Sequence, residues 1–251
     1  MIHFCVFYSP AFKPRARICM RSIRDHHPGV EIHGVTIQSE AKPGTYIEGF
    51  HKARFQWMRD KLPTLPAGDR LIFVGADCGF YGPATGFLQM VEEKDIVVVP
   101  HVITPPKLRG KDMNLTGHAN GDIFSFSPEA LPVLDWLLEQ DMVNDPAKGV
   151  FYEQTWLTSL PFVAENVGIY RQPDMNLAWF NFHERSVTEQ DGQPYVNGLP
   201  LVMAHFTGYV QGSPNRASRY YGGPDVTGPL LKLYEGYEEA LTRAEKSSES
   251  H

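Results

Sequence analysis

The chain has 251 residues, 42% of them hydrophobic and 21% charged, with a formal net charge of −6. Such a composition is typical of a globular protein and excludes a disordered chain. The length fits one large domain or two small ones. The negative net charge argues against a large binding surface for nucleic acid or anionic lipid, because such surfaces need clustered Lys and Arg.

The three cysteines, Cys5, Cys19 and Cys78, are odd in number and form no C-x-x-C pair. We interpret them as free thiols in a reducing compartment. The apolar segment 1–8 is too short for a signal peptide, and no apolar run reaches the length of about 18 residues that a membrane span needs. We expect a soluble, cytoplasmic protein with no transmembrane segment.

Short apolar runs alternate with amphipathic segments along most of the chain, which favours an α/β fold with a mainly parallel sheet. We expect a single domain over residues 1–227, a helix over 228–246 and a disordered tail at 247–251. Residues 101–119 have no hydrophobic periodicity and predict a mobile flap over a ligand site. Predicted strands cover Ile2–Tyr8, Glu31–Ile37, Arg70–Val74, Asp95–Val99, Ile123–Phe126 and Leu201–Phe206, and predicted helices begin near Pro14, span Phe50–Leu62 and follow Ser127.

Two polar side chains lie at or just beyond the carboxyl ends of predicted strands. Asp77 comes after the strand Arg70–Val74, and His205 lies in the last predicted strand, followed by Gly208. Ligands of α/β sheets bind beyond the carboxyl ends of strands, so both side chains are candidates to contact a metal ion or a phosphate. Taken singly, Asp77 could instead cap a turn and His205 could be a core residue with internal hydrogen bonds.

Two further segments combine polar and aromatic groups. Glu153 and Gln154 lie in an otherwise amphipathic helix, where they could face a sugar or simply face solvent. Residues 176–185 (NLAWFNFHER) place amides and charges beside aromatic rings, as sugar-binding surfaces do. Within it we expect Asn181 and His183 to face a cleft, and Glu184 and Arg185 to pair with each other or with backbone. A loop held together by its own hydrogen bonds would look similar.

In chain order these segments resemble bacterial GT-A type glycosyltransferases, particularly glycosyltransferase family 8 and related capsule and exopolysaccharide transferases. The resemblance runs from about residue 16 to residue 209. It is carried by KARF followed by RLIFVGADCGFYGP, by FSFSPEALPVLDW, by YEQTWLTSLP, and most specifically by NLAWFNFHERSV and YVNGLPLVMAHFTGY.

The resemblance implies a GT-A fold, with a Rossmann-like, mostly parallel mixed sheet, and a role for each matching residue. Asp77 and His205 would hold a divalent ion, Mn²⁺ or Mg²⁺. Glu153 and Gln154 would be the catalytic pair facing the transferred sugar, while Asn181 and His183 would contact substrate. The remaining donor-binding positions implied by the resemblance are Tyr8, Arg54, Ala76, Asn120 and Gly208, together with Asp77 itself.

The chain departs from the family pattern at three places. Gly75 stands where the family usually has the first Asp of its metal motif, and Asp122 stands where a Gly is common. The Lys that often follows the HxxG element is missing, although Arg216 and Arg219 lie downstream.

The expected activity is transfer of a sugar from a nucleotide-diphosphate sugar to a glycan or glycoconjugate acceptor, with retention at the anomeric carbon. Two alternatives stay open. One is a phage-type transferase that glycosylates DNA bases, against which the acidic balance argues. The other is a non-catalytic module that binds nucleotide sugars, which Gly75 motivates.

Overall fold

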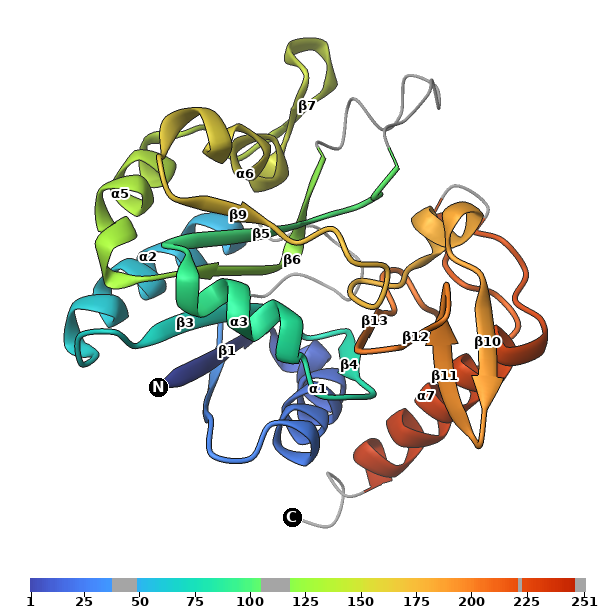
Figure 1. The fold of residues 1–251 in the computed structure, drawn as a ribbon. Coiled ribbons are helices and arrows are strands. Elements are labelled where there is room, and N and C mark those ends of the chain that lie inside the picture. The colour runs from blue at the N-terminus through green and yellow to red at the C-terminus, as the bar shows by residue number, and fades with distance from the viewer. Residues whose placement is uncertain (38–48, 105–117, 221–222, 247–251) are drawn as a thin grey trace.

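The computed structural model describes residues 1–37, 49–104, 118–220 and 223–246. Its centre is a six-stranded mixed sheet in the order β2-β1-β3-β6-β5-β9 (Figure 1). β1 pairs in parallel with β2 and β3, and β5 with β9, whereas β6 runs antiparallel to both of its neighbours. The strands are β1 (Ile2–Tyr8), β2 (Glu31–Thr36), β3 (Arg70–Gly75), β5 (Ile96–Pro100), β6 (Ala119–Phe126) and β9 (Val167–Ile169).

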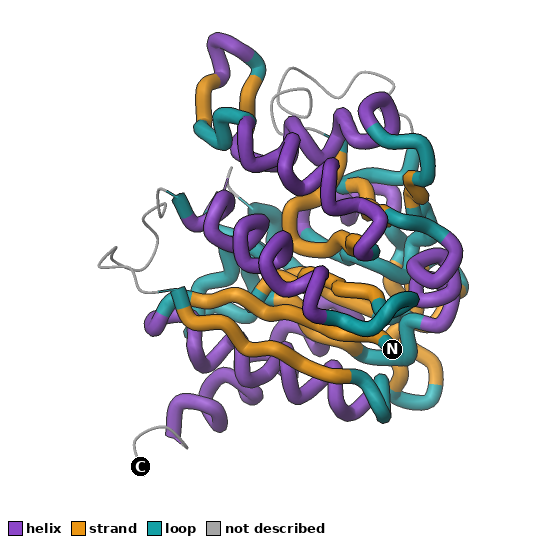
Figure 2. Tube along the Cα trace, turned by 90° about the vertical axis from the view of Figure 1, so that its left-hand side faces the viewer, coloured by secondary structure: helices purple, strands orange, loops and turns teal. Residues whose placement is uncertain are grey.

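Helices cover both faces of this sheet, as the turned view in Figure 2 shows. Alternate residues of a strand point to opposite faces, so the two faces bury different side chains. α2 (Phe50–Lys61), α5 (Leu131–Glu139) and α6 (Tyr152–Val163) pack on the face that contains Phe73 and Phe124. α1 (Lys13–His26) and α3 (Thr85–Glu93) pack on the opposite face.

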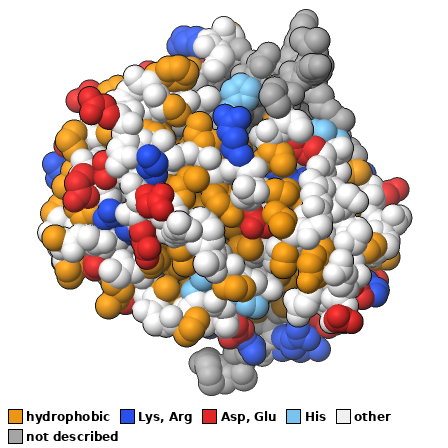
Figure 3. All heavy atoms as spheres, viewed as in Figure 1, with side chains coloured by type: hydrophobic (Ala, Val, Ile, Leu, Met, Phe, Trp, Pro, Cys, Tyr) orange, Lys and Arg blue, Asp and Glu red, His pale blue; other side chains and the backbone are white. Residues whose placement is uncertain are grey.

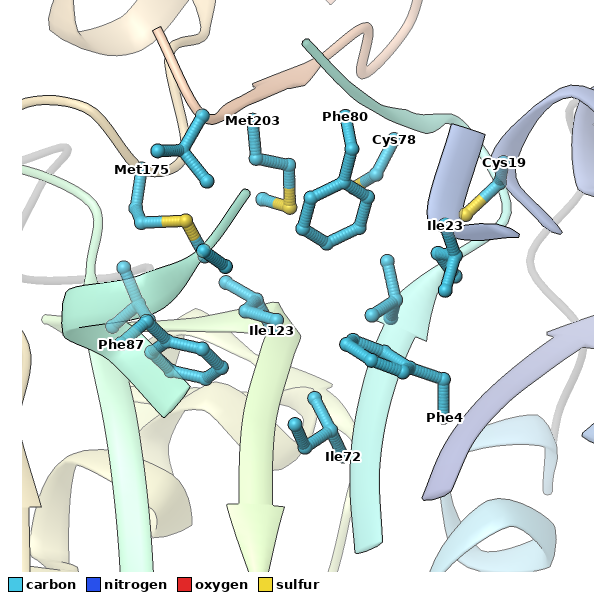
Figure 4. Packing of buried hydrophobic residues seen from close by; sticks show 14 of the residues in the cluster. Phe4, Cys19, Ile23, Ile72, Cys78, Phe80, Phe87, Ile123, Met175 and Met203 are labelled. Atoms are coloured by element: carbon cyan, nitrogen blue, oxygen red, sulfur yellow. The ribbon is translucent and has the colours of Figure 1, made fainter. Parts of the chain in front are cut away.

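The α1/α3 face also carries a small second sheet. β4 (Cys78–Phe80) pairs antiparallel with β13 (Met203–His205), and Phe80 and Met203 enter the same core as Phe4 and Phe87. Figure 4 shows these side chains packing above the ends of the central strands. The predicted strand Leu201–Phe206 therefore belongs to this small sheet and not to the central one.

The C-terminal helix α7 (Gly228–Lys246) lies against the small sheet and α1. Its side chains Tyr234 and Tyr237 are buried, and the Tyr237 ring stacks on Phe206 with ring centroids 3.8 Å apart. The remaining elements are β7 (Asn144–Asp145), β8 (Val150–Phe151), β10 (Val187–Gln190), β11 (Gln193–Val196), β12 (Leu199–Pro200) and the short 3-10 turns Pro10–Phe12, Leu62–Thr64, Pro128–Ala130, Pro146–Lys148 and Trp179–Glu184.

Most predicted elements agree with the structure to within a residue or two at their ends. The main difference is β6, which begins at Ala119 and not at residue 123. The helix α3 was not predicted. Most of the predicted flap, residues 105–117, and the predicted disordered tail lie outside the described residues.

The aromatic packing of α3 gives a test of the core. Phe87 is 1% exposed and its ring meets Tyr170 edge-on at 5.6 Å, so Phe87→Ala should lower the free energy of unfolding by about 3–5 kcal/mol. Phe162 is 89% exposed, and Phe162→Ala should change it by less than about 0.5 kcal/mol. Urea denaturation checks both values, and equal losses for the two variants would contradict the packing described.

Candidate active site

Asp77 and His205 converge although they are far apart in sequence. Asp77 follows β3 and directly precedes β4, while His205 ends β13 and pairs with Cys78 of β4. The Phe206 amide also donates a hydrogen bond to the Asp77 carbonyl at 2.9 Å. Backbone pairing of β4 with β13 therefore brings the two side chains together, with 3.5 Å between Asp77 Oδ1 and His205 Nε2.

A second carboxylate, from Asp122 of β6, faces the same imidazole. Asp122 Oδ2 also lies 3.5 Å from His205 Nε2. We call Asp77, Asp122 and His205 the carboxylate–histidine cluster. In the sequence, Asp122 stood out only as a departure from the family pattern. The strand that carries it was predicted to begin at residue 123, so Asp122 was not placed on a strand.

The charges of the cluster are strongly coupled. Burial alone would lower the pKa of His205, but Asp77 and Asp122 outweigh it and raise that pKa. Burial alone would raise the pKa of Asp77, but the facing His205 lowers it overall. Burial raises the pKa of Asp122 in spite of His205, and the negative charge of Asp77 adds to the increase. Two carboxylates close to one ring make this a place that favours a cation.

Asn176 fixes the orientation of His205. Its Nδ2 donates to the Pro100 carbonyl at 3.2 Å, so its Oδ1 is the atom that lies 3.3 Å from His205 Nδ1. Nδ1 is then the donor in this contact. In the neutral imidazole this leaves the lone pair on Nε2, the atom that faces the two carboxylates. Asn176 was considered only as part of the segment 176–185, and its contact with His205 could not be inferred from sequence.

A small hollow opens beside the cluster. It has a volume of about 200 Å³, and its lining includes Asp77, Gly208, Arg15 and Arg219. Gly208 has a φ of +71°, and a Cβ atom there would overlap Ser218 and Tyr220. Glycine is therefore required both by the backbone conformation and by the space. The hollow combines two carboxylates, those of Asp77 and Glu245, with two guanidinium groups.

The side chains of Arg54 and Glu153 contact each other inside the protein, and the donor-binding and catalytic roles expected for them stay predictions. Both are 1% exposed, and Arg54 Nη2 lies 2.5 Å from Glu153 Oε1. Arg54 also donates to the Gly121 carbonyl at 2.8 Å, and Glu153 contacts His51 Nδ1. The Arg54 guanidinium lies 4.5 Å from the centroid of the Phe73 ring. In this arrangement they form a buried ion pair between α2 and α6.

Gln154, the neighbour of Glu153, has a different environment. Its Oε1 is buried and has no hydrogen-bond partner among the residues that the structure describes. Its Cγ lies against Gly121, next to Asp122 in sequence. An acceptor left without a partner costs about 1–3 kcal/mol, so this atom is suited to a hydroxyl donor supplied by a ligand.

Asn181 is held by hydrogen bonds inside the protein, and its predicted substrate contact stays a prediction. It is 0% exposed, its Nδ2 donates to the carbonyls of His101 and Asn176, and its Oδ1 accepts from the Ala178 amide at 3.0 Å. All of these bonds lie inside the protein and hold the loop around Asn181 together. His183 is exposed, and its predicted substrate contact stays a prediction.

Glu184 and Arg185 pair with each other and with backbone, as predicted. Arg185 Nε lies 3.8 Å from Glu184 Oε1, and Arg185 Nη1 donates to the Met175 carbonyl at 2.6 Å. Glu184 accepts a hydrogen bond from the Ile103 amide at 2.8 Å. These contacts fix the loop 176–185 to the end of β5.

The other predicted donor-binding residues lie at strand ends. Tyr8 ends β1 and is half-buried, and the Ala76 side chain is buried beside Asp77. Asn120 is 2% exposed, and its Oδ1 accepts a hydrogen bond from the Asp122 amide at 2.7 Å. Asn120 therefore helps to hold the backbone of Asp122, and a direct contact of any of the three with a donor remains a prediction.

Solved glycosyltransferase structures share this fold. A glycosyltransferase involved in glycosylation of the major capsid of PBCV-1 aligns over 83% of this chain and 94% of its own, with a TM-score of 0.56 and 11% identity. The galactosyltransferase LgtC, solved with donor and acceptor sugar analogues, aligns over 96% of this chain and 95% of its own, with a TM-score of 0.53 and 11% identity. The chain has a GT-A type fold.

The same fold occurs in the glycosyltransferase GlyE of Streptococcus pneumoniae, with a TM-score of 0.52, 12% identity, and coverage of 98% of this chain and 63% of that one. In sequence, the chain is 23% identical over 190 residues to the uncharacterized protein YfnF of Bacillus subtilis. That match covers 72% of this chain and 62% of YfnF, so the chain spans less than two thirds of its relative.

The sequence matches no protein-family model. Within the described residues, no helix combines the length and apolarity that crossing a bilayer requires.

The Arg54–Glu153 pair predicts a specific response to acid. Burial acts to raise the pKa of Glu153, but Arg54 and His51 outweigh the effect of burial and lower this pKa from 4.5 to about 2. A lowered pKa stabilises the fold above pH 4.5, and this contribution is lost as the pH falls from 4.5 towards 2. We therefore expect Glu153→Gln to reduce the acid dependence of the unfolding free energy in that window.

At pH 7 the same variant leaves Arg54 buried without its partner, which should destabilise the fold by about 3–5 kcal/mol. The double variant Arg54→Met/Glu153→Gln removes both charges and should recover part of that loss. Urea denaturation at several pH values measures both effects. An unchanged acid dependence in Glu153→Gln would count against the ion pair as the origin of the response.

Proposed function

We propose that this protein is a nucleotide-sugar-dependent glycosyltransferase that uses a divalent ion held by Asp77 and His205. The observation that carries this proposal is their convergence beside a hollow lined by Gly208 and Arg219, within a GT-A fold. Carboxylate, imidazole, guanidinium and open backbone are the groups that an ion bound to a diphosphate requires.

The donor atoms of the cluster fit Mg²⁺ or Mn²⁺. Neighbouring ligands of an octahedral Mg²⁺ lie about 3 Å apart, close to the 3.5 Å between Asp77 Oδ1 and His205 Nε2. Cys78 Sγ is also nearby, and burial raises the pKa of this thiol well above its usual range. When bound, the ion would neutralise charge that develops on the leaving nucleoside diphosphate.

The hollow supplies the remaining contacts for a diphosphate. Gly208 lets a ligand approach the backbone closely, and Arg219 is exposed at the rim. Arg15 donates to the Tyr209 carbonyl at 3.1 Å, which fixes its guanidinium beside the hollow. On this proposal Arg15 and Arg219 take the place of the Lys that the family pattern has after its HxxG element.

Gln154 is the residue we assign to the transferred sugar. Its unpartnered Oε1 can accept a sugar hydroxyl and can face positive charge that develops at the anomeric carbon. We propose retention of configuration, with Gln154 as a stabilising group and not a nucleophile. The proposed acceptor is a glycan or glycoconjugate.

The net charge of −6 favours a glycan acceptor over DNA. On the face in Figure 3, Lys and Arg side chains are interspersed with Asp and Glu, and no continuous basic stripe crosses it. A nucleic-acid footprint needs such a stripe. The alternative of a non-catalytic binding module predicts donor binding without any release of nucleoside diphosphate.

The proposed activity is tested with a panel of nucleotide sugars, by measuring nucleoside diphosphate release with and without Mn²⁺. We expect stimulation by Mn²⁺ for at least one donor, and a loss of at least about 100-fold in Asp77→Asn, because the variant removes a charged ligand. The control is Asp191→Asn, which changes an exposed residue in the turn between β10 and β11 and should retain full activity. Donor binding without turnover would favour the non-catalytic alternative.

Gly208 offers a second test with a matched control. Gly208→Ala introduces a Cβ atom that overlaps Ser218 and Tyr220, and it should weaken both donor binding and thermal stability. Gly212 has a similar φ of +82° but open space around its Cβ position, so Gly212→Ala should cost only about 1 kcal/mol of backbone strain. The measurements are the melting temperature and the Kd for nucleoside diphosphates in Mn²⁺. Equal donor affinity in the two variants would contradict a role for Gly208.

A further inference from the structure

Position 75, at the end of β3, has no room for a side chain. A Cβ atom placed on Gly75 would lie 2.6 Å from Asp122 Oδ1 and 2.8 Å from Asp122 Cβ. Both distances are shorter than real Cβ contacts. The Asp122 side chain therefore occupies the volume into which a residue at position 75 would project.

The register of the sheet explains this overlap. Val74 of β3 pairs with Ile123 of the antiparallel strand β6, so the next residues, Gly75 and Asp122, stand opposite each other. Side chains at directly opposed positions are neighbours on one face of the sheet, and here the Asp122 side chain lies over Gly75. An acid in either strand can therefore reach the same point, but two acids cannot occupy it together.

From that point the Asp122 carboxylate joins the other two groups of the carboxylate–histidine cluster. Asp122 Oδ2 and Asp77 Oδ1 are each 3.5 Å from His205 Nε2. The side chains of Asp77 and Asp122 are 18% and 35% exposed, whereas that of His205 is 3% exposed. Asn176 holds the far nitrogen of His205 and turns Nε2 towards both carboxylates.

We propose that Asp122 is a third protein ligand of the divalent ion, supplying from β6 the carboxylate that Gly75 cannot supply from β3. This inference rests on the metal-dependent activity proposed above. On this proposal the departures at positions 75 and 122 are linked. The acid that the family carries at the first position is carried here at the second, and the glycine of the second position is carried at the first. A chain without an acid at position 75 then keeps two carboxylates at its ion.

The competing role for Asp122 is to orient His205 without touching the ion. The two roles differ in metal affinity, which can be measured with Mn²⁺ alone and without any donor, by the loss of the free-ion signal in electron paramagnetic resonance. Asp122→Asn keeps the size of the side chain and removes its charge. We expect it to weaken Mn²⁺ binding at least about tenfold at an unchanged melting temperature.

Asp191→Asn is the matched control and should bind Mn²⁺ as the wild-type chain does, while Asp77→Asn should lose binding. Mn²⁺ affinity within twofold of wild type in Asp122→Asn would overturn this inference and leave the proposed function standing. Failure of the wild-type chain to bind Mn²⁺ would overturn the proposed ion and the inference together.

A reciprocal exchange gives an independent test. Gly75→Asp alone should lower the melting temperature, because its side chain overlaps Asp122. The double variant Gly75→Asp/Asp122→Gly relieves that overlap and returns an acid to the same place. We expect it to melt higher than Gly75→Asp and to bind Mn²⁺ at least about tenfold more tightly than Asp122→Gly. A double variant as weak as Asp122→Gly would show that the two positions are not interchangeable, and would overturn the exchange.

Discussion

The buried ion pair between Arg54 and Glu153 is the constraint on which the site depends. Taking two charges out of water costs several kcal/mol per ion, and only close contacts on all sides offset that cost. Arg54 therefore stacks on Phe73, donates to the Gly121 carbonyl and meets Glu153 at 2.5 Å. A Cβ atom on Gly121 would overlap the Glu153 carboxylate, so β6 needs a glycine where it contacts the ion pair. The pair joins α2, α6 and β6 at one point.

That point lies one residue before Asp122, and it determines how the end of β6 is held. The pairing of β5 with β6 is irregular between Val98 and Pro100, and such irregularities re-aim side chains. Asn120 Oδ1 accepts a hydrogen bond from the Asp122 amide, and the Gly121 carbonyl accepts one from Arg54. These two bonds fix the backbone next to the Asp122 side chain. On the opposite side of the cluster, Asn176 fixes His205. The cluster is thus assembled from strand ends whose positions are set by backbone contacts, as a preorganised site requires.

The sequence predicted the strands and helices well wherever hydrophobic periodicity was clear, as in Ile2–Tyr8 and the last helix. It predicted that Asp77 and His205 meet, although the pairing that joins them, between β4 and β13, was not foreseen. It missed the start of β6, because Asn, Gly and Asp are poor strand formers and only tertiary pairing places them there. It did not show that Arg54, Glu153 and Asn181 have partners inside the protein, because a residue type does not reveal partners that are distant in sequence.

The opposed positions 75 and 122 carry a wider consequence for how such sites are inferred. At this opposed pair, the Asp122 side chain fills the volume that a side chain at position 75 would need, so the identities of the two residues are coupled even though they are far apart in sequence. A missing acid at the end of β3, considered alone, favours a protein that has lost its ion and its activity. Considered with its neighbour across the ladder, the same glycine is the condition that makes room for an acid on β6. On the role proposed for Asp122, the second carboxylate at the ion is set by a place in the sheet, and either strand could supply it.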